Sequence, residues 1–346
     1  MGLVNWIANK RKHTPGFVYI DDNFSAMLGK VMTFYQRYGC SFPSDQAQLL
    51  ELWDILKVDH ELAKQVFGRV LVIIGFEVDA NAMTITMPKS KLTELLAGLR
   101  EFTALSSSKR FPRHSLSRFQ NIAGWVNWAF NSFPLLKPAL SNVYEKMGGK
   151  SQLRALVYVN QGIVRDLDWF SGHVRNSTGV HILESLDWDV QDADVEAFCD
   201  ASLGGMGIYF PAIGLGYQSN PPAVTPPPGV IFYLEALCVC WCLHRVAGLV
   251  RENGNVQTDN ENTFHMFSSL RAKPGYNEIL KSSVDILLAN NFQLRVLLIP
   301  GKQNVVADAL SRWRNDIAIA EHGINYPENP LIDAHLSPPD IPVYAG

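Results

Sequence analysis

Apolar residues follow two patterns of spacing along the first half of the chain, and each pattern predicts a different kind of element. A spacing of three and four residues predicts helices at 44–65, 89–102, 115–129, 135–146 and 153–169. Short apolar runs predict strands at 17–19, 70–78 and 83–87. The first strand leads into the turn-prone Asp21, Asp22 and Asn23, so we expect a hairpin with two carboxylates at its tip.

Strands and helices alternate more regularly in the second half. Strands are predicted at 195–200, 207–210, 255–258 and 292–299. Helices are predicted at 232–250, 263–270, 277–289 and 305–314. Prolines predict a loop at 221–229 and a linker-like tail at 321–346. The change of pattern between the halves indicates at least two modules.

Composition and charge narrow the class of protein. With 47% hydrophobic and 18% charged residues, the 346-residue chain is typical of a globular protein and excludes disordered and coiled-coil classes. The net charge of −3 argues against a polycation that binds nucleic acid by charge alone. The charge is uneven, with 18 basic and 12 acidic residues in 1–150 but 12 and 21 in 151–346. We therefore expect a carboxylate cluster in the second half.

The five cysteines predict a reducing environment. Their number is odd and three of them, Cys238, Cys240 and Cys242, lie two apart, which disfavours a disulfide framework and favours an intracellular location, in the cytoplasm or nucleus. Together with His244 they could form a metal cluster. On one helix, however, Cys240 faces away from the other two, so burial as small apolar residues is favoured. No uninterrupted apolar run reaches 18 residues, so no membrane span is expected.

Four acidic residues lie where predicted elements begin or end. Asp200 and Asp259 each end a strand, Glu235 lies in the first turns of an apolar helix, and Asp308 begins the last helix. Each alone is explained as an ordinary turn or helix-start residue. As an ordered set they favour a site for two Mg²⁺ ions, because Mg²⁺ prefers carboxylate oxygens and paired ions serve phosphodiester cleavage.

The surrounding motifs resemble the ribonuclease H domain of retroelement reverse transcriptases. They are Phe198-Cys199-Asp200-Ala201-Ser202, Leu234-Glu235-Ala236, Thr258-Asp259-Asn260-Glu261-Asn262, Ile299-Pro300-Gly301-Lys302-Gln303-Asn304 and Ala307-Asp308-Ala309-Leu310-Ser311-Arg312. The ending, Asn-x-x-Ala-Asp-x-Leu-Ser-Arg, is the most specific of them.

The resemblance implies an α/β (α+β) fold with a mixed five-stranded sheet flanked by helices. It also implies that Asp200, Glu235, Asp259 and Asp308 bind two Mg²⁺ ions, for which Mn²⁺ can substitute, and cut the RNA strand of RNA/DNA hybrids. Cellular ribonucleases H often carry a histidine before the last carboxylate. None lies between His265 and His322 here, which implies slower turnover or another route of metal release.

The first half resembles other parts of a reverse transcriptase. Tyr19-Ile20-Asp21-Asp22 is similar to the palm hairpin that contributes metal-binding aspartates, and 75–79 with 85–88 is similar to the stretch that grips the primer. Residues 123–140 resemble the connection of DIRS-type retrotransposons, in which a tyrosine recombinase follows. The resemblance implies a partial palm and start of thumb at 1–105, a helical thumb and connection at 106–190, and a ribonuclease H-like domain at 191–320.

Polymerase activity is not expected from this chain alone. Only 18 residues precede Tyr19, so the earlier palm aspartate and the fingers that the family uses are missing, and Asp21 and Asp22 would form a vestigial metal site. Another chain would have to supply the missing palm strand. A second hypothesis is a catalytically inactive remnant that only binds nucleic acid.

Candidate nucleic-acid contacts lie in the first half. Lys109, Arg110, Arg113 and Arg118 form the densest basic patch, which is either a phosphate track or a solvated loop. Trp125 and Trp128 would either stack on bases or belong to the apolar core of a helix, and the core is the favoured interpretation.

Overall fold

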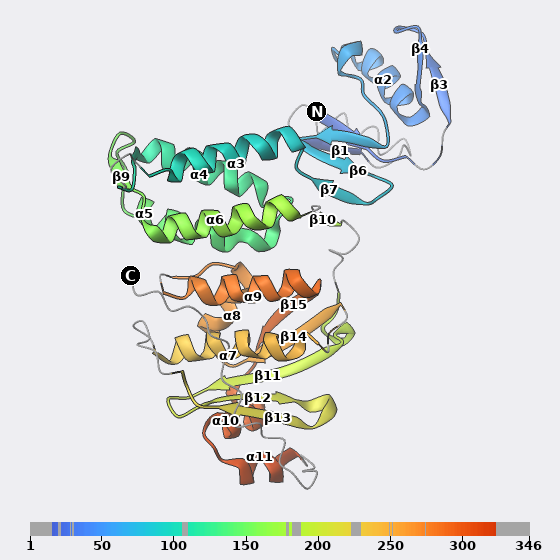
Figure 1. The fold of residues 1–346 in the computed structure, drawn as a ribbon. Coiled ribbons are helices and arrows are strands. Elements are labelled where there is room, and N and C mark those ends of the chain that lie inside the picture. Colours follow the sequence, from blue (N-terminus) through green and yellow to red (C-terminus); the bar gives the residue numbers. More distant parts are fainter. Residues whose placement is uncertain are drawn as a thin grey trace. The chain divides into compact units, whose positions relative to one another are not determined.

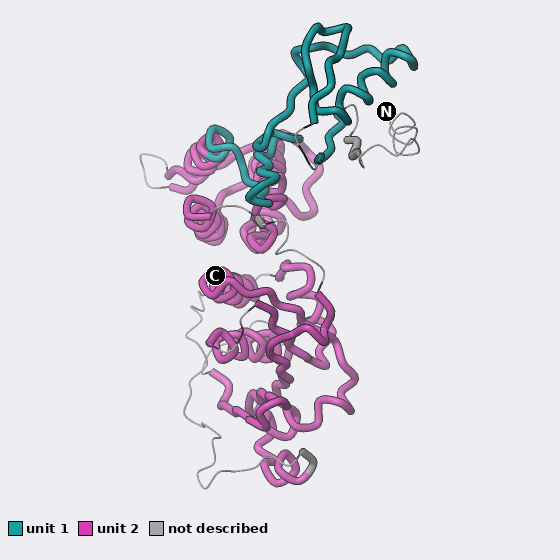
Figure 2. The backbone as a smooth tube through the Cα atoms, turned by 90° about the vertical axis from the view of Figure 1, so that its right-hand side faces the viewer, with its two compact units in different colours: residues 1–92, 178–186 teal, residues 93–177, 187–346 magenta. Residues whose placement is uncertain are grey.

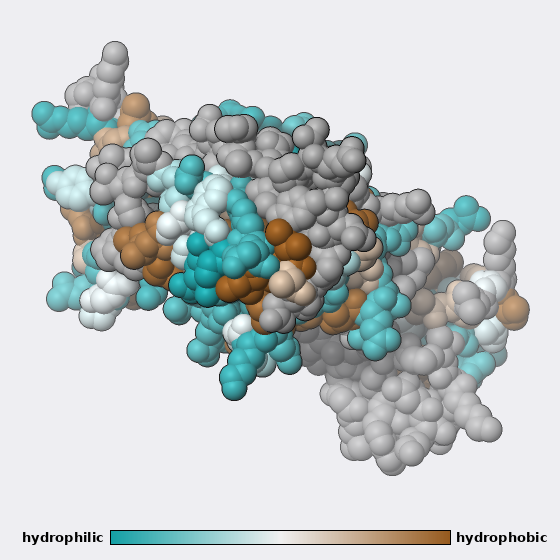
Figure 3. All heavy atoms as spheres, turned by 90° about the horizontal axis from the view of Figure 1, so that it is seen from below, coloured by the Kyte–Doolittle hydropathy of each residue, from teal (hydrophilic) through white to brown (hydrophobic). Residues whose placement is uncertain are grey.

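The chain forms two compact units, which Figure 2 shows in different colours. The computed structural model describes residues 16–19, 22–27, 29, 31–105, 110–177, 180–181, 188–222, 230–248, 250, 252–273 and 275–322. Unit 1 comprises 1–92 and 178–186, and unit 2 comprises 93–177 and 187–346. Within the described residues, no helix has the length and apolar character that a membrane crossing requires. The surface seen in Figure 3 mixes hydrophilic and hydrophobic side chains.

Unit 1 is built from short antiparallel strands and one longer helix. Strands β1 (Gly16–Tyr19) and β2 (Asp22–Ser25) form a hairpin, as do β3 (Met32–Tyr35) and β4 (Cys40–Pro43). A four-stranded sheet has the order β10-β7-β6-β5, from Val180–His181, Thr84–Thr86, Phe76–Asp79 and Val70–Ile73. Helix α2 (Ser44–Leu56) packs on β3 and β4 around a small apolar cluster. The predicted hairpin at the paired aspartates is confirmed, since Tyr19 lies opposite Asp22.

Two predictions for unit 1 were wrong in detail, and one hairpin was missed. The apolar run 70–78 is not one buried strand but the β5–β6 hairpin, because Ile74 and Gly75 both adopt positive φ and turn the chain. Val72, 62% exposed, shows that this sheet is open to solvent on one face. The helix predicted over 44–65 ends at Leu56, where Lys57 is left-handed, and η1 (Leu62–Lys64) is a separate 3₁₀ turn. The pattern did not predict the β3–β4 hairpin.

The first part of unit 2 is helical (Figure 1). It contains α3 (Lys89–Thr103) from Thr93 onward, α4 (Leu116–Ala129), the 3₁₀ helix η2 (Pro134–Leu140), α5 (Ser141–Met147) and α6 (Gln161–Asn176). A short ladder joins β8 (Arg113–Ser115) and β9 (Leu156–Tyr158). The Ser115 hydroxyl accepts from the Arg118 backbone N–H at 3.2 Å and caps α4. The helix predicted over 153–169 was wrong at its start, because 156–158 pair with β8 and Asn160 caps α6. The helix predicted over 135–146 divides into η2 and α5, with Pro138 inside η2.

The second part of unit 2 contains the sheet that the resemblance implied. Its order is β13-β12-β11-β14-β15, from Leu215–Ser219, Met206–Phe210, Val195–Ala201, Asn253–Thr258 and Gln293–Leu298. The first three strands are antiparallel, and β11, β14 and β15 are parallel. The α/β fold class and the mixed five-stranded sheet with flanking helices are confirmed. The apolar pattern had revealed four of these strands but not β13.

Helices cover this sheet. Helix α7 (Val230–Val246) is buried almost all round and packs with α8 (Glu261–Ser269) and α9 (Asn277–Asn290) into the main apolar core. Helix α10 (Val305–Ser311) packs on β12, followed by α11 (Asn315–His322). The close approach of α10 requires a residue without a side chain, since a Cβ at Gly207 would lie 2.7 Å from the Ser311 nitrogen. Short 3₁₀ turns complete this part as η3 (Val190–Asp192), η4 (Pro211–Ile213) and η5 (Gly301–Gln303).

The last predicted helix, 305–314, was too long. It ends at Ser311, because Trp313 adopts a left-handed conformation with φ of 60° and starts a new direction for α11. The proline-rich tail, apart from residues 321–322, and most of the loop 221–229 lie outside the described residues.

Candidate metal centre

Three carboxylates from different elements meet at one edge of the five-stranded sheet. Asp200 is the penultimate residue of β11, Asp259 directly follows β14, and Glu235 lies in the second turn of α7. Parallel neighbours β11 and β14 end at the same sheet edge, which brings the two aspartates together. Ligand oxygens of all three side chains lie within 4.8 Å of one another. This spacing suits carboxylates that share a cation.

Glu235 is buried, and no described cation pairs with it directly. Glu235 is 4% exposed, and its Oε2 has no hydrogen-bond partner among the described residues. Burial, together with repulsion from the carboxylates of Asp200 and Asp259, raises the pKa of Glu235 to about 9. The backbone N–H of Ala201 acts in the opposite direction by donating to the carboxylate. An ionised Glu235 therefore favours a bound cation.

Asp200 is also buried, but it has a local donor. Burial raises the pKa of Asp200 to about 6, while a hydrogen bond from the Ser311 hydroxyl to Oδ2 lowers it. Asp259 and Asp308 raise the pKa by repulsion. Ser311 is the last residue of α10, so this helix helps to orient the Asp200 side chain.

Asp259 lies against the turn that leads into α10. A Cβ at Gly301 would stand 2.9 Å from Asp259 Oδ2, so a side chain here would push this carboxylate out of its position. The next residue, Asn260, caps α8 by accepting from the Thr263 N–H at 3.0 Å. The pair Asp259 and Asn260 thus combines a carboxylate of the cluster with a helix cap.

Asp308 lies in the same region but is engaged differently. Its Oδ1 accepts from Arg312 Nε at 2.7 Å, and its Oδ2 accepts from Arg314 Nη2. Its repulsion on Asp200 shows that it belongs to the same electrostatic neighbourhood. It is not among the three residues whose ligand oxygens converge within 4.8 Å. The structure thus assembles three of the predicted acids and holds the fourth in an ion pair.

Sequence reasoning had named no role for three polar residues that support this site. The amide of Asn304 donates to the Cys199 carbonyl at 2.9 Å and fastens the start of α10 to β11. The Ser202 hydroxyl donates to the Ser311 carbonyl at 2.7 Å and accepts from backbone N–H groups of the β11–β12 turn. Ser311 supplies the donor for Asp200. The sequence could have indicated them, because all three lie in the motifs that resemble a ribonuclease H domain.

The structure describes only some of the residues predicted for the vestigial polymerase site and for nucleic-acid contact. Asp22 is exposed at the first residue of β2, whereas Asp21 and Lys109 lie outside the described residues. Arg113 is exposed, and its guanidinium carbon lies 3.9 Å from the centroid of the Tyr158 ring. Arg118 pairs with Glu101 at 3.4 Å, and Arg110 is exposed. The four basic residues stay candidates for phosphate contact.

The favoured interpretation of the tryptophans was wrong for Trp125. The buried face of α4 carries Leu116, Phe119, Ile122, Ala123, Val126 and Ala129. Trp125 lies off this face, is 42% exposed, and covers Gly98 of α3. Trp128 is half-buried.

The favoured interpretation of the cysteines is confirmed. Cys238, Cys240 and Cys242 are fully buried in α7. The thiol of Cys238 faces the sheet, 3.3 Å from the Asp200 carbonyl, whereas Cys240 faces the serines of α9. Burial raises the pKa of Cys240 to about 11. These thiols pack as apolar groups.

The three clustered acids fit a Mg²⁺ or Mn²⁺ ion by their chemistry. All offer hard oxygen ligands, and two are buried carboxylates whose charge no described cation neutralises by direct pairing. The buried Oε2 of Glu235 without a partner is the observation that a cation would explain.

Comparison with known proteins finds matches among solved structures alone. No family model and no curated protein matches the sequence. Among solved structures the chain is similar to RNase H1 from the halophilic archaeon Halobacterium salinarum NRC-1, with a TM-score of 0.29 and 14% identity over 35% of this chain and 97% of that one. It is also similar to a foamy viral protease-reverse transcriptase in complex with dsDNA, with a TM-score of 0.37 and 12% identity over 86% of this chain. The chain spans 58% of the length of that viral protein.

Proposed function

We propose that this chain is a metal-dependent endonuclease of the ribonuclease H type that cuts the RNA strand of RNA/DNA hybrids. The observation that carries the proposal is the convergence of Asp200, Glu235 and Asp259 within 4.8 Å at one sheet edge, with Glu235 lacking a partner among described residues. Asp308, close by on α10, would complete the ligand set for two Mg²⁺ ions.

In this proposal the protein supplies an ordered set of oxygens. Asp200, Glu235 and Asp259 would hold the first ion, and Asp308 together with Asp200 would hold the second. When bound, such ions activate water and neutralise charge on the departing 3′ oxygen. Ser311 holds the Asp200 carboxylate in place, and Asn304 and Ser202 fix α10 and the β11–β12 turn around it.

Substrate contacts would come from surface features rather than from base reading. Hybrid selectivity would depend on 2′-hydroxyl contacts and minor-groove shape. Arg110, Arg113 and Arg118, at and beside β8, are the described candidates for phosphate contact. Lys109, which lies outside the described residues, is a further candidate. We place the helical thumb and connection at 106–190, the nuclease at 191–320 and a partial palm at 1–105.

We further infer a retroelement origin of the DIRS type, with a tyrosine recombinase as a partner module of the parent element. This inference rests on the motif at 304–312 and the stretch at 123–140 described above. DNA polymerisation is not part of the proposed activity. Primer extension by this chain alone would contradict that part of the proposal.

Cleavage of a labelled RNA/DNA hybrid tests the nuclease proposal. We expect cleavage in Mg²⁺ or Mn²⁺, none in EDTA, and none from Asp200→Asn or Asp259→Asn. Asp168→Asn, which neutralises an exposed acid on α6, is the matched control and should cleave normally. If the folded wild type is as inert as the two variants yet binds the hybrid, the chain is a non-catalytic nucleic-acid-binding remnant instead.

A further inference from the structure

Two arginines occupy both oxygens of Asp308. Arg312 Nε donates to Oδ1 at 2.7 Å, and Arg314 Nη2 donates to Oδ2. The side chains are partly open to solvent, with 51% and 45% of the arginine side chains and 30% of the aspartate exposed. Asp308 is thus neutralised by protein cations, in contrast to Glu235.

The backbone after α10 reverses direction and brings Arg314 back beside Asp308. Trp313 adopts a φ of 60°, which costs a non-glycine residue roughly 1 kcal/mol. Its indole N–H donates to the Gly204 carbonyl at 2.9 Å, which fastens this conformation to the β11–β12 turn. The reversal lets the Arg314 N–H donate to the Ala309 carbonyl at 2.8 Å, so its side chain returns beside Asp308. A conformation held against local strain favours a functional role for the residue that it positions.

The charge of Arg312 reaches beyond its partner. Asp308 raises the pKa of Arg312 most, and Asp200 and Asp259 add to the effect. Arg312 also lowers the pKa of Asp200 and of Glu235, although burial outweighs it at both. The guanidinium therefore lies in the combined field of all four acids, where a second cation would otherwise be favoured.

We propose that Arg312 and Arg314 form a clamp on Asp308 that makes the two metal sites unequal. This inference rests on the proposed function. The three clustered acids are free to bind one ion, whereas Asp308 can serve a second ion only after it releases the arginines. Once released, the two guanidinium groups can pair with phosphate oxygens, so a nucleic-acid backbone that engages them favours filling of the second site. The clamp thus couples second-ion binding to the substrate.

Counting of bound Mn²⁺ by electron paramagnetic resonance on the full chain tests this proposal without reference to cleavage. Wild type should bind one ion, with the second at least about tenfold weaker, since two solvent-exposed pairs together contribute roughly 1 to 1.5 kcal/mol. Arg312→Gln/Arg314→Gln should strengthen the second ion about tenfold and leave the first unchanged. Adding Asp308→Asn to that variant should remove the second ion. Arg271→Gln/Lys273→Gln removes two exposed charges from the loop after α8 and should behave as wild type.

The outcomes separate the clamp from the nuclease proposal. Two equally tight ions in wild type, or no gain from releasing the arginines, would overturn the clamp while leaving the metal centre intact. Equal gains in the clamp variant and in the loop control would also overturn it, because net charge alone would then explain the effect. If wild type binds no ion, or if Asp200→Asn/Glu235→Gln binds as wild type does, the metal centre fails and the clamp fails with it. Thermal unfolding of each variant establishes that it is folded, and Arg312→Lys/Arg314→Lys should keep the second ion weak.

Discussion

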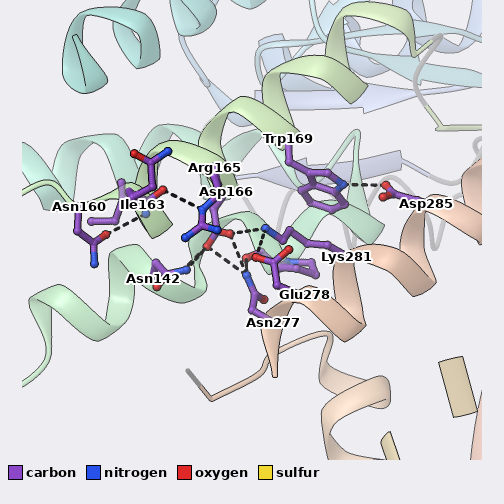
Figure 4. Close-up of polar contacts among 12 residues, drawn as sticks. Asn142, Asn160, Ile163, Arg165, Asp166, Trp169, Asn277, Glu278, Lys281 and Asp285 are labelled. Atoms are coloured by element: carbon purple, nitrogen blue, oxygen red, sulfur yellow. Dashed lines mark hydrogen bonds and ion pairs between the residues drawn. The ribbon is translucent and has the colours of Figure 1, made fainter. Parts of the chain in front are cut away.

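Two buried carboxylates in unit 2 differ in how their charge is compensated. Asp166 on α6 accepts from Lys281 Nζ of α9 at 2.9 Å and from the amides of Asn142 and Asn277 at 2.7 and 3.1 Å (Figure 4). Glu235 on α7 faces two other carboxylates and has an oxygen without a partner among the described residues. Asp166 is compensated by a cation and two amides, whereas Glu235 faces carboxylates of the same charge.

The contrast separates a structural role from a functional one. Burial raises the pKa of Asp166, although Lys281 and the amides act against it. Desolvation lowers the pKa of Lys281, but the carboxylates of Asp166 and Glu278 outweigh it and the net pKa is raised. The pair joins the helical part of unit 2 to α9, near a second contact in which Trp169 and His173 both reach Asp285 at 2.7 Å. A buried acid such as Glu235, which has an oxygen without a partner among the described residues, costs stability and is a candidate for ligand binding.

Removal of the cation from the satisfied site should give the largest effect. Lys281→Met leaves Asp166 buried without its charge partner and should lower the free energy of unfolding by about 3–5 kcal/mol. Asp166→Asn/Lys281→Met removes both charges and should recover much of the loss. Urea denaturation checks both, with exposed Lys150→Met as the neutral control. A single variant as stable as wild type would contradict the structural role of the pair.

Neutralising the unsatisfied acid should have the opposite sign. Glu235→Gln removes a carboxyl whose pKa is about 9 in the folded chain and about 4.5 when unfolded, so it should raise the metal-free free energy of unfolding by about 2–3 kcal/mol at pH 7. The same variant should lose cleavage. Denaturation in EDTA measures the gain. Destabilisation by this substitution would show that Glu235 is satisfied in a way the contacts do not reveal.

The pH dependence of stability should follow from the same shift. Because the folded chain holds a proton on Glu235 that the unfolded chain releases, stability should fall as pH rises from about 4.5 towards 9. Asp200, with a pKa of about 6, contributes only to the lower part of this range. Denaturation of metal-free protein between pH 7 and 9 therefore isolates Glu235. The decline should be present in wild type and absent in Glu235→Gln, and parallel curves would refute the assignment.

The smallest effect should come from Ser311→Ala. Loss of the hydroxyl removes the hydrogen bond that lowers the pKa of Asp200, so that pKa should rise above about 6, and the acidic limb of the cleavage profile should move to higher pH. The stability change should stay near 1 kcal/mol. Ser283→Ala removes another buried hydroxyl, which donates to the Ile279 carbonyl at 2.8 Å on α9, and should leave the profile unmoved.

The sequence predicted the cluster of acids better than it predicted the structural ion pair, and the reason is physical. Asp200 and Asp259 end strands and lie in motifs, so local pattern and resemblance both mark them. Asp166 and Lys281 lie 115 residues apart on two amphipathic helices, and nothing local distinguishes them from solvated charges. Only tertiary packing reveals the pair.

The missed elements have similar causes. The apolar run 70–78 hides a turn, because Ile74 takes a positive φ that its residue type disfavours. Strand β9 is three residues long and is defined by its pairing with β8. The clamp on Asp308 depends on the left-handed Trp313, which is equally invisible in a hydrophobic pattern.

Thermal unfolding with and without Mg²⁺ at pH 8 tests the central claim that the unsatisfied acids form a cation site. Saturating Mg²⁺ should raise the Tm of wild type by about 2–4 °C relative to EDTA, because binding to the folded chain alone stabilises it. Asp200→Asn/Glu235→Gln should show no such shift, whereas Asp168→Asn should match wild type. An equal shift in wild type and the double variant, or none in either, would contradict the account.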